Sequence, residues 1–60
     1  MSEEAVNNRL AELSGKYIVW AEYDPKTDRW KIDLMSKTVD ERHKQDNLTH
    51  QEALDLMENL

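Results

Sequence analysis

Residues 17–36, YIVWAEYDPKTDRWKIDLMS, predict a β-hairpin whose two strands pair in one particular register. Apolar residues recur at every second position on both sides of the loop, which is the period of a strand with one covered face. Placing Tyr23 opposite Trp30 makes one face of the ribbon wholly apolar. The other pairs on this face are Ala21 with Ile32 and Val19 with Leu34. We therefore expect this face to pack on the rest of the domain.

The charged residues of the hairpin support the same register. Glu22 then lies opposite Lys31, and Asp24 lies opposite Arg29, which gives two opposite-charge cross-strand pairs. A slip of one residue would turn the apolar face to solvent and separate both charge pairs. The four-residue loop 25–28, with Asp24 before its proline, is typical of a type I turn that needs no glycine.

The second face of the hairpin also carries apolar residues, which a sheet covered on one side would leave in water. They are Ile18, Trp20 and Met35, with Asp33 and Lys16 as a polar rim. Tryptophan is enriched at interface hot spots and methionine adapts to varied surfaces, so we predict that the three apolar residues and Asp33 bind a partner. The alternative is that residues 37–47 cover Trp20 within the same chain.

Two helices are predicted to flank the hairpin in the sequence. The first spans residues 3–14, with Ser2 as its N-cap and Gly15 just after its end. Its inward stripe is Val6, Leu10 and Leu13. The apolar face of the hairpin would pack on both helices.

The second helix begins after a capping box formed by Thr49 and Glu52, whose side chains satisfy each other's backbone N–H groups. Leu48, just before the cap, can pack onto Ala53 as a hydrophobic staple. The inward stripe is Ala53, Leu56, Met57 and Leu60. No C-cap residue follows Leu60, so we expect the last turn to fray.

The predicted fold class is α+β, a two-layer sandwich in which residues 1–60 form one small domain. Residues 37–47 contain a single apolar residue, Val39. They form an irregular segment or a polar edge strand over residues 38–43, or else Thr38 and Glu41 cap a short helix. With that strand, the order αβββα is shared with double-stranded RNA-binding domains. In those domains the last helix binds phosphates through basic side chains, whereas the last helix of this chain is acidic. We therefore do not expect direct nucleic-acid binding.

Length and composition limit the kind of protein this is. Sixty residues without cysteine cannot form disulfides, and a domain of this size is often supported by a partner chain. No apolar run is long enough to cross a membrane, and the N-terminus is acidic, unlike a signal peptide. We expect a soluble cytoplasmic protein.

The sequence contains little that could support catalysis. It has no cysteine nucleophile, and its only glycine is placed at a helix end, which leaves no phosphate-binding loop. His43, Asp46 and His50 match no established ligand spacing. We therefore predict a protein that is not an enzyme and uses no metal or cofactor.

We predict a small, non-catalytic protein-binding module or inhibitor. It would act through the exposed hairpin face or a sheet edge, either on another protein or on a second copy of itself. The alternative is an acidic mimic of nucleic acid that occupies the basic groove of a DNA- or RNA-binding enzyme. In size and charge the chain resembles phage-encoded anti-defence inhibitors. The acids that would carry this alternative are Glu3, Glu4, Glu12, Glu52, Asp55 and Glu58.

Overall fold

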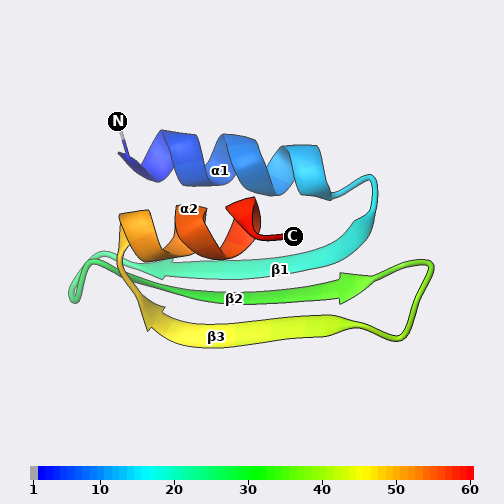
Figure 1. Cartoon of the computed structure of the whole chain (residues 1–60). Coiled ribbons are helices and arrows are strands. Elements are labelled where there is room, and N and C mark those ends of the chain that lie inside the picture. Colours follow the sequence, from blue (N-terminus) through cyan, green and yellow to red (C-terminus); the bar gives the residue numbers. More distant parts are fainter. Residues whose placement is uncertain (1) are drawn as a thin grey trace.

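The computed structural model describes residues 2–60, apart from the side chain of Ser2. In chain order the elements are α1 (Ser2–Leu13), β1 (Tyr17–Asp24), β2 (Arg29–Ser36), β3 (Arg42–Leu48) and α2 (His50–Glu58). The strands form one antiparallel sheet in the order β1-β2-β3, and both helices lie over the same face of it (Figure 1). The predicted two-layer α+β class is confirmed.

The hairpin register is the one that the sequence predicts. Tyr23 pairs with Trp30, Ala21 with Ile32 and Val19 with Leu34. Exposure alternates along β1 and β2, and the residues that share a face with Trp30 point toward the helices. The apolar pattern was therefore sufficient to fix the pairing of these strands.

The two cross-strand charge pairs lie opposite each other as predicted, but neither forms a salt bridge. The Arg29 guanidinium donates to the backbone carbonyls of Thr27 and Asp28 instead, at 3.5 and 3.2 Å. The Asp24 carboxylate accepts the backbone N–H of Lys26 at 2.9 Å. These side chains therefore stabilise the hairpin loop more directly than they join the strands.

The hairpin loop contains a residue in the left-handed region. Asp28 has φ of 58°, and its N–H donates to the Asp24 carbonyl at 2.8 Å. No glycine is present, as predicted, because aspartate tolerates this conformation better than most residues. The Asp28 carboxylate lies 3.1 Å from the ring of His50, at the start of α2, a contact that belongs to the site described below.

A third strand is present, but it occupies residues 42–48 and not 38–43. It pairs with β2 as an edge strand, with a register shift opposite Trp30 and Ile32 and a positive φ of 56° at Asn47. Apart from its last residue, Leu48, this strand contains no aliphatic residue, and only Leu48 is buried. The sequence therefore lacks the alternation that would have located the strand.

The core is built from one stripe on each helix and the inner face of the sheet. Its buried residues are Val6, Leu10, Leu13, Trp30, Ile32, Leu34, Leu48, Ala53 and Met57. The predicted stripes are confirmed except at Leu60, which lies beyond α2 and is exposed. This core occupies one layer between helices and sheet, and no helix of residues 2–60 lies on the opposite face of the sheet.

The helix ends differ in part from the prediction. Gly15 has no positive φ, so it does not close α1 with a left-handed residue; the Lys37 ammonium caps this end by donating to the Ser14 carbonyl at 2.8 Å. The predicted Ser2 cap lies outside the described side chains.

At α2 the predicted capping box is confirmed. Thr49 Oγ1 accepts the N–H of Glu52 at 3.1 Å, and the Glu52 carboxylate accepts the N–H of Thr49 at 2.9 Å. The hydrogen bond from the Thr49 backbone lowers the pKa of Glu52. Asn59 closes the other end, with its backbone N–H on the Asp55 carbonyl, so the expectation of an uncapped last turn was wrong.

Candidate functional site

The face of the sheet turned away from the helices, here called the outer face, carries the predicted partner-binding residues. Ile18 is 58% exposed, Trp20 is 52% exposed and Met35 is 40% exposed. The segment after β2 forms the loop 37–41 and then pairs beyond β2, so it does not cover Trp20. The interpretation that Trp20 is buried by residues 37–47 is therefore excluded.

Cross-strand pairing places the outer-face residues in rows across the sheet. One row is Ile18, Met35 and Arg42, and the next is Trp20, Asp33 and Lys44. The three predicted apolar residues are therefore neighbours, with Ile18 and Met35 directly opposite each other. Side chains that lie opposite or diagonal to each other on neighbouring strands are close enough for contact, so Ile18, Trp20 and Met35 form one patch.

Asp33, the predicted polar residue of the site, is held by an arginine from the edge strand. Arg42 donates from Nε to Oδ1 at 3.0 Å and from Nη2 to Oδ2 at 2.6 Å. This two-pronged contact lowers the pKa of Asp33, chiefly through the hydrogen bonds from the guanidinium. Asp33 therefore holds Arg42 beside Met35 at the edge of the patch. Both carboxylate oxygens of Asp33 already accept hydrogen bonds from Arg42.

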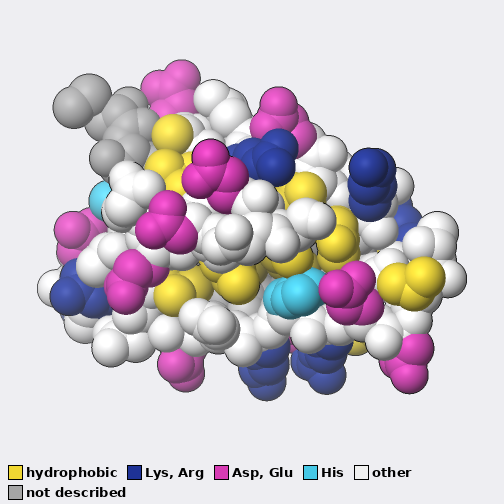
Figure 2. Space-filling view, in the orientation of Figure 1, with side chains coloured by type: hydrophobic (Ala, Val, Ile, Leu, Met, Phe, Trp, Pro, Cys, Tyr) yellow, Lys and Arg dark blue, Asp and Glu magenta, His cyan; other side chains and the backbone are white. Residues whose placement is uncertain are grey.

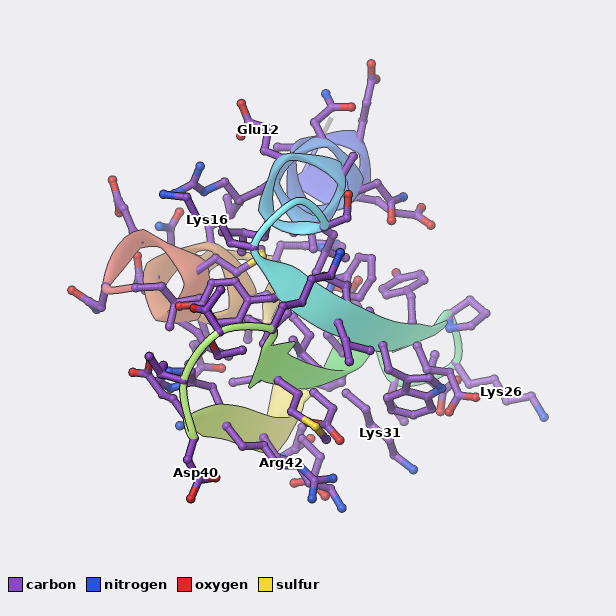
Figure 3. The ribbon with its side chains drawn as sticks, turned by 90° about the vertical axis from the view of Figure 1, so that its right-hand side faces the viewer. Glu12, Lys16, Lys26, Lys31, Asp40 and Arg42 are labelled. Carbon is purple, nitrogen blue, oxygen red and sulfur yellow. The ribbon has the colours of Figure 1, made fainter. Side chains whose placement is uncertain are left out.

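A hollow of about 450 Å³ opens beside Trp20 on the outer face. It is lined by Trp20, Lys31, Ile32, Lys44, Gln45 and Asp46. Asp33, at the centre of the row from Trp20 to Lys44, is short and is held by Arg42, which leaves the middle of the row open. Figure 3 shows Lys31 and Arg42 pointing away from the helices on this side. The hollow therefore has an indole on one wall and ammonium groups on others.

A second cluster, which the sequence did not reveal, joins the hairpin loop to the start of α2. The indole Nε1–H of Trp30 donates to Nδ1 of His50 at 2.9 Å. Nδ1 is therefore the acceptor, and the neutral ring carries its proton on Nε2. Nε2 lies 3.1 Å from Oδ1 of Asp28, which also accepts the Tyr23 hydroxyl at 2.6 Å. We call these four residues the His50 cluster.

Ring packing adds to the hydrogen bonds of the His50 cluster. The Tyr23 ring is stacked on His50 with centroids 5.4 Å apart, and Trp30 meets the same ring edge-on at 6.1 Å. The chain neighbours of His50 are mostly polar, whereas its spatial neighbours are aromatic. Both of its ring nitrogens are engaged, so neither is positioned to take a proton from a substrate in this arrangement.

His43 has different partners from His50. Its Nε2 lies 3.1 Å from the Glu41 carboxylate, and its ring meets the ring of Tyr17 edge-on at 6.3 Å. The two histidines thus do not form one site with Asp46. Within residues 2–60 no three histidine, cysteine or acidic side chains are grouped so that they could hold a metal ion.

The acids of the alternative function lie on the helices. Together α1 and α2 carry six acids and one base, Arg9, so the whole net charge of −5 is located there. Figure 2 shows acidic side chains spread over the helical layer. Arg9 interrupts them and forms an ion pair with Glu12 at 3.2 Å. The molecule therefore has an acidic helical side and an electrically balanced sheet side.

The His50 cluster makes a prediction about Tyr23. The hydrogen bond to the Asp28 carboxylate raises the pKa of Tyr23 to about 12 from the ordinary 10.0. The stability that this bond contributes is therefore fully present below about pH 10 and is lost as the pH rises toward 12. Near-ultraviolet absorbance titration should show one late tyrosine in the wild type and a return of Tyr23 toward its ordinary value in Asp28→Asn. An unchanged titration curve in that variant would contradict the assignment.

The chain was compared with protein families, curated proteins and solved structures. No family model matches the chain, and no significant match was found among curated proteins or solved structures. Within the described part of the chain, neither helix is long and apolar enough to cross a membrane.

Proposed function

We propose that this protein is a small, non-catalytic binding module that uses the outer face of its sheet to bind another protein surface. The observation that supports the proposal is the patch of Ile18, Trp20 and Met35, which lies on rigid strands and receives no cover from residues 2–60. Ile18, Trp20 and Met35 are three of the five large hydrophobic side chains that are exposed among the described residues.

The residues of the patch have the properties of a binding hot spot. A half-exposed tryptophan removes a large area from water when a partner covers it, and it loses little side-chain entropy because the sheet already restricts it. Met35 can adapt to the shape of the partner, and Arg42 and Lys44 supply a polar rim. Each feature favours binding, and none of them supplies a reacting group.

The face is a better candidate than either edge of the sheet. The β3 edge is charged and irregular, and it contains Asn47 with a positive φ, which are features that oppose the addition of a strand. In Figures 1 and 3, α1 runs alongside β1 on the side away from β2. A helix in that position restricts access to the β1 edge.

Two kinds of partner fit the outer face, namely a second copy of the chain and a different protein. Size-exclusion chromatography with light scattering separates them, because Trp20→Asp should halve the mass of a dimer and leave a monomer unchanged. Capture from a lysate of the source cells on immobilised protein tests the second kind. We expect Trp20→Asp to lose what the wild type binds.

The matched control is Gln51→Asp, which adds the same charge on the exposed surface of α2. It should keep both the mass and the captured partner of the wild type. If Trp20→Asp showed the same mass and the same captured proteins as the wild type, the outer face would not be the binding surface.

The acidic helical side supports a second candidate, the mimic of nucleic acid. The specific observation is that α1 and α2 together carry six acids and one base, which accounts for the entire net charge, and Figure 2 shows acidic side chains on this layer. Such a mimic binds by Coulomb attraction, so its affinity for a basic partner should fall steeply with salt. An affinity that stayed constant between low and high salt would eliminate it.

A further inference from the structure

The His50 cluster connects three parts of the fold that are distant in sequence. Asp28 comes from the hairpin loop, Tyr23 and Trp30 from β1 and β2, and His50 from the first position of α2. Trp30 is almost completely buried, and the ring nitrogen of His50 is the acceptor found for its indole N–H. The buried end of the hairpin thus depends on one nitrogen atom of a residue that can change its charge near neutral pH.

A second proton on His50 would change that nitrogen from an acceptor to a donor. In the imidazolium both ring nitrogens carry hydrogen, so Nδ1–H would face the Trp30 N–H at the present 2.9 Å. Two donors cannot share a hydrogen bond, and a buried N–H without an acceptor is costly. The contact with Trp30 must then open, while the contact with Asp28 gains a full ionic character.

Charged groups on the neighbouring elements act on the equilibrium between the neutral and the protonated ring of His50. The Asp28 carboxylate faces Nε2 directly, and Asp24 and Glu3 bring negative charge close to the Tyr23 hydroxyl. These groups favour the imidazolium, whereas Arg29 lies near Asp28 and opposes it.

The helix itself also opposes the positive charge. His50 is the first residue of α2, where the helix dipole is positive, and the nearby Glu52 is already occupied by the capping box. The carboxylate of Asp28 in the hairpin loop thus stabilises the positive charge of a protonated His50, and the dipole of α2 destabilises it. Protonation is therefore expected to open the contact with Trp30 and to keep the contact with Asp28.

We propose that the His50 cluster is a pH-operated clamp, in which protonation of His50 breaks its hydrogen bond with Trp30 and turns its existing contact with Asp28 into an ion pair. With His50 neutral, the clamp fastens the start of α2 to the buried end of the hairpin. With His50 protonated, the indole of Trp30 is released and the start of α2 loosens from the sheet. This inference concerns the inner face and the loop, so it does not depend on the function proposed for the outer face.

Hydrogen exchange of the two indole N–H groups, followed by NMR from about pH 7.5 to about pH 5, tests the clamp. Trp20 lies on the outer face, and its exposed indole serves as the internal reference for the intrinsic effect of pH. We expect the protection of the Trp30 indole relative to Trp20 to fall by about tenfold or more as the pH decreases. Constant relative protection over this range would overturn the proposal.

Two variants identify the groups involved. In His50→Asn the amide oxygen can still accept from Trp30 but does not titrate, so the pH-dependent loss of protection should disappear. In Asp28→Asn the imidazolium loses its partner, so the loss should move to lower pH. A loss that persisted unchanged in His50→Asn would show that another group controls Trp30.

Nitrogen chemical shifts of the His50 ring in the wild type provide a check that does not require either variant to fold. At neutral pH they should identify Nε2 as the protonated nitrogen and Nδ1 as the acceptor. The opposite tautomer would be incompatible with the clamp, because Nδ1 would then already be a donor.

Discussion

Replacing Leu34 by alanine is expected to leave a large part of the molecules unfolded under conditions where the wild type is folded. Leu34 is completely buried at the centre of the inner face, opposite Val19 on β1 and His43 on β3. Removing a buried leucine side chain costs about 2–5 kcal/mol. A domain of 60 residues has a total stability of only about 3–9 kcal/mol, so this change removes a major fraction of it.

Urea unfolding followed by circular dichroism measures this effect. The matched control is Val39→Ala, because Val39 is 60% exposed in the loop between β2 and β3. The control should shift the unfolding free energy by no more than about 0.5 kcal/mol. A Leu34→Ala protein with the midpoint of the wild type would contradict the placement of Leu34 in the core.

Replacing Trp20 by alanine is expected to have the opposite profile, with a large effect on binding and a smaller one on folding. The side chain is half exposed on the outer face, so the folded chain alone derives less from it than from Leu34. At a hot spot such a truncation costs about 2 kcal/mol or more, which is about a thirtyfold loss of affinity. Ile18→Ala and Met35→Ala, at the margin of the patch, should cost less.

Titration calorimetry with the captured partner, or dilution of the dimer if the partner is a second copy, measures the loss. Val39→Ala again serves as the control, since it removes an equally exposed apolar side chain from outside the strands. Equal losses for Trp20→Ala and Val39→Ala would indicate general stickiness, and the proposed hot spot would be wrong.

The sequence predicted those parts of the fold in which burial and periodicity coincide. The register of β1 and β2 follows from the match of Tyr23 with Trp30, because a strand with one covered face permits only one pairing. The capping box of Thr49 and Glu52 is a local arrangement, so four residues of sequence contain all of it. Both were confirmed.

The parts that were missed depend on contacts between distant residues. The third strand shows no alternation because it is an edge, with polar residues even on its inner side, such as His43 and Gln45. The His50 cluster joins residues 20 positions apart in the chain through Trp30. Its members are not spaced in any pattern, and they meet through the packing of the hairpin end against the start of α2.

The sequence predicted which apolar residues share the exposed face of the sheet, whereas their role in binding stays a prediction. Ile18, Trp20 and Met35 share the exposed face as the alternation required. The sequence could not show that Arg42 occupies Asp33, because the position of β3 beside β2 was not known. It also could not show the hollow beside Trp20, because Lys44, Gln45 and Asp46 line it from β3.

Site-directed photo-crosslinking tests most directly whether the outer face is the binding surface. A photoreactive amino acid is placed at position 20 in one protein and at position 51, on the exposed surface of α2, in another. We predict a specific adduct from position 20, with the partner or with a second copy, and none from position 51. Adducts from position 51 and none from position 20 would contradict the proposal and would place the interface on the acidic helical side.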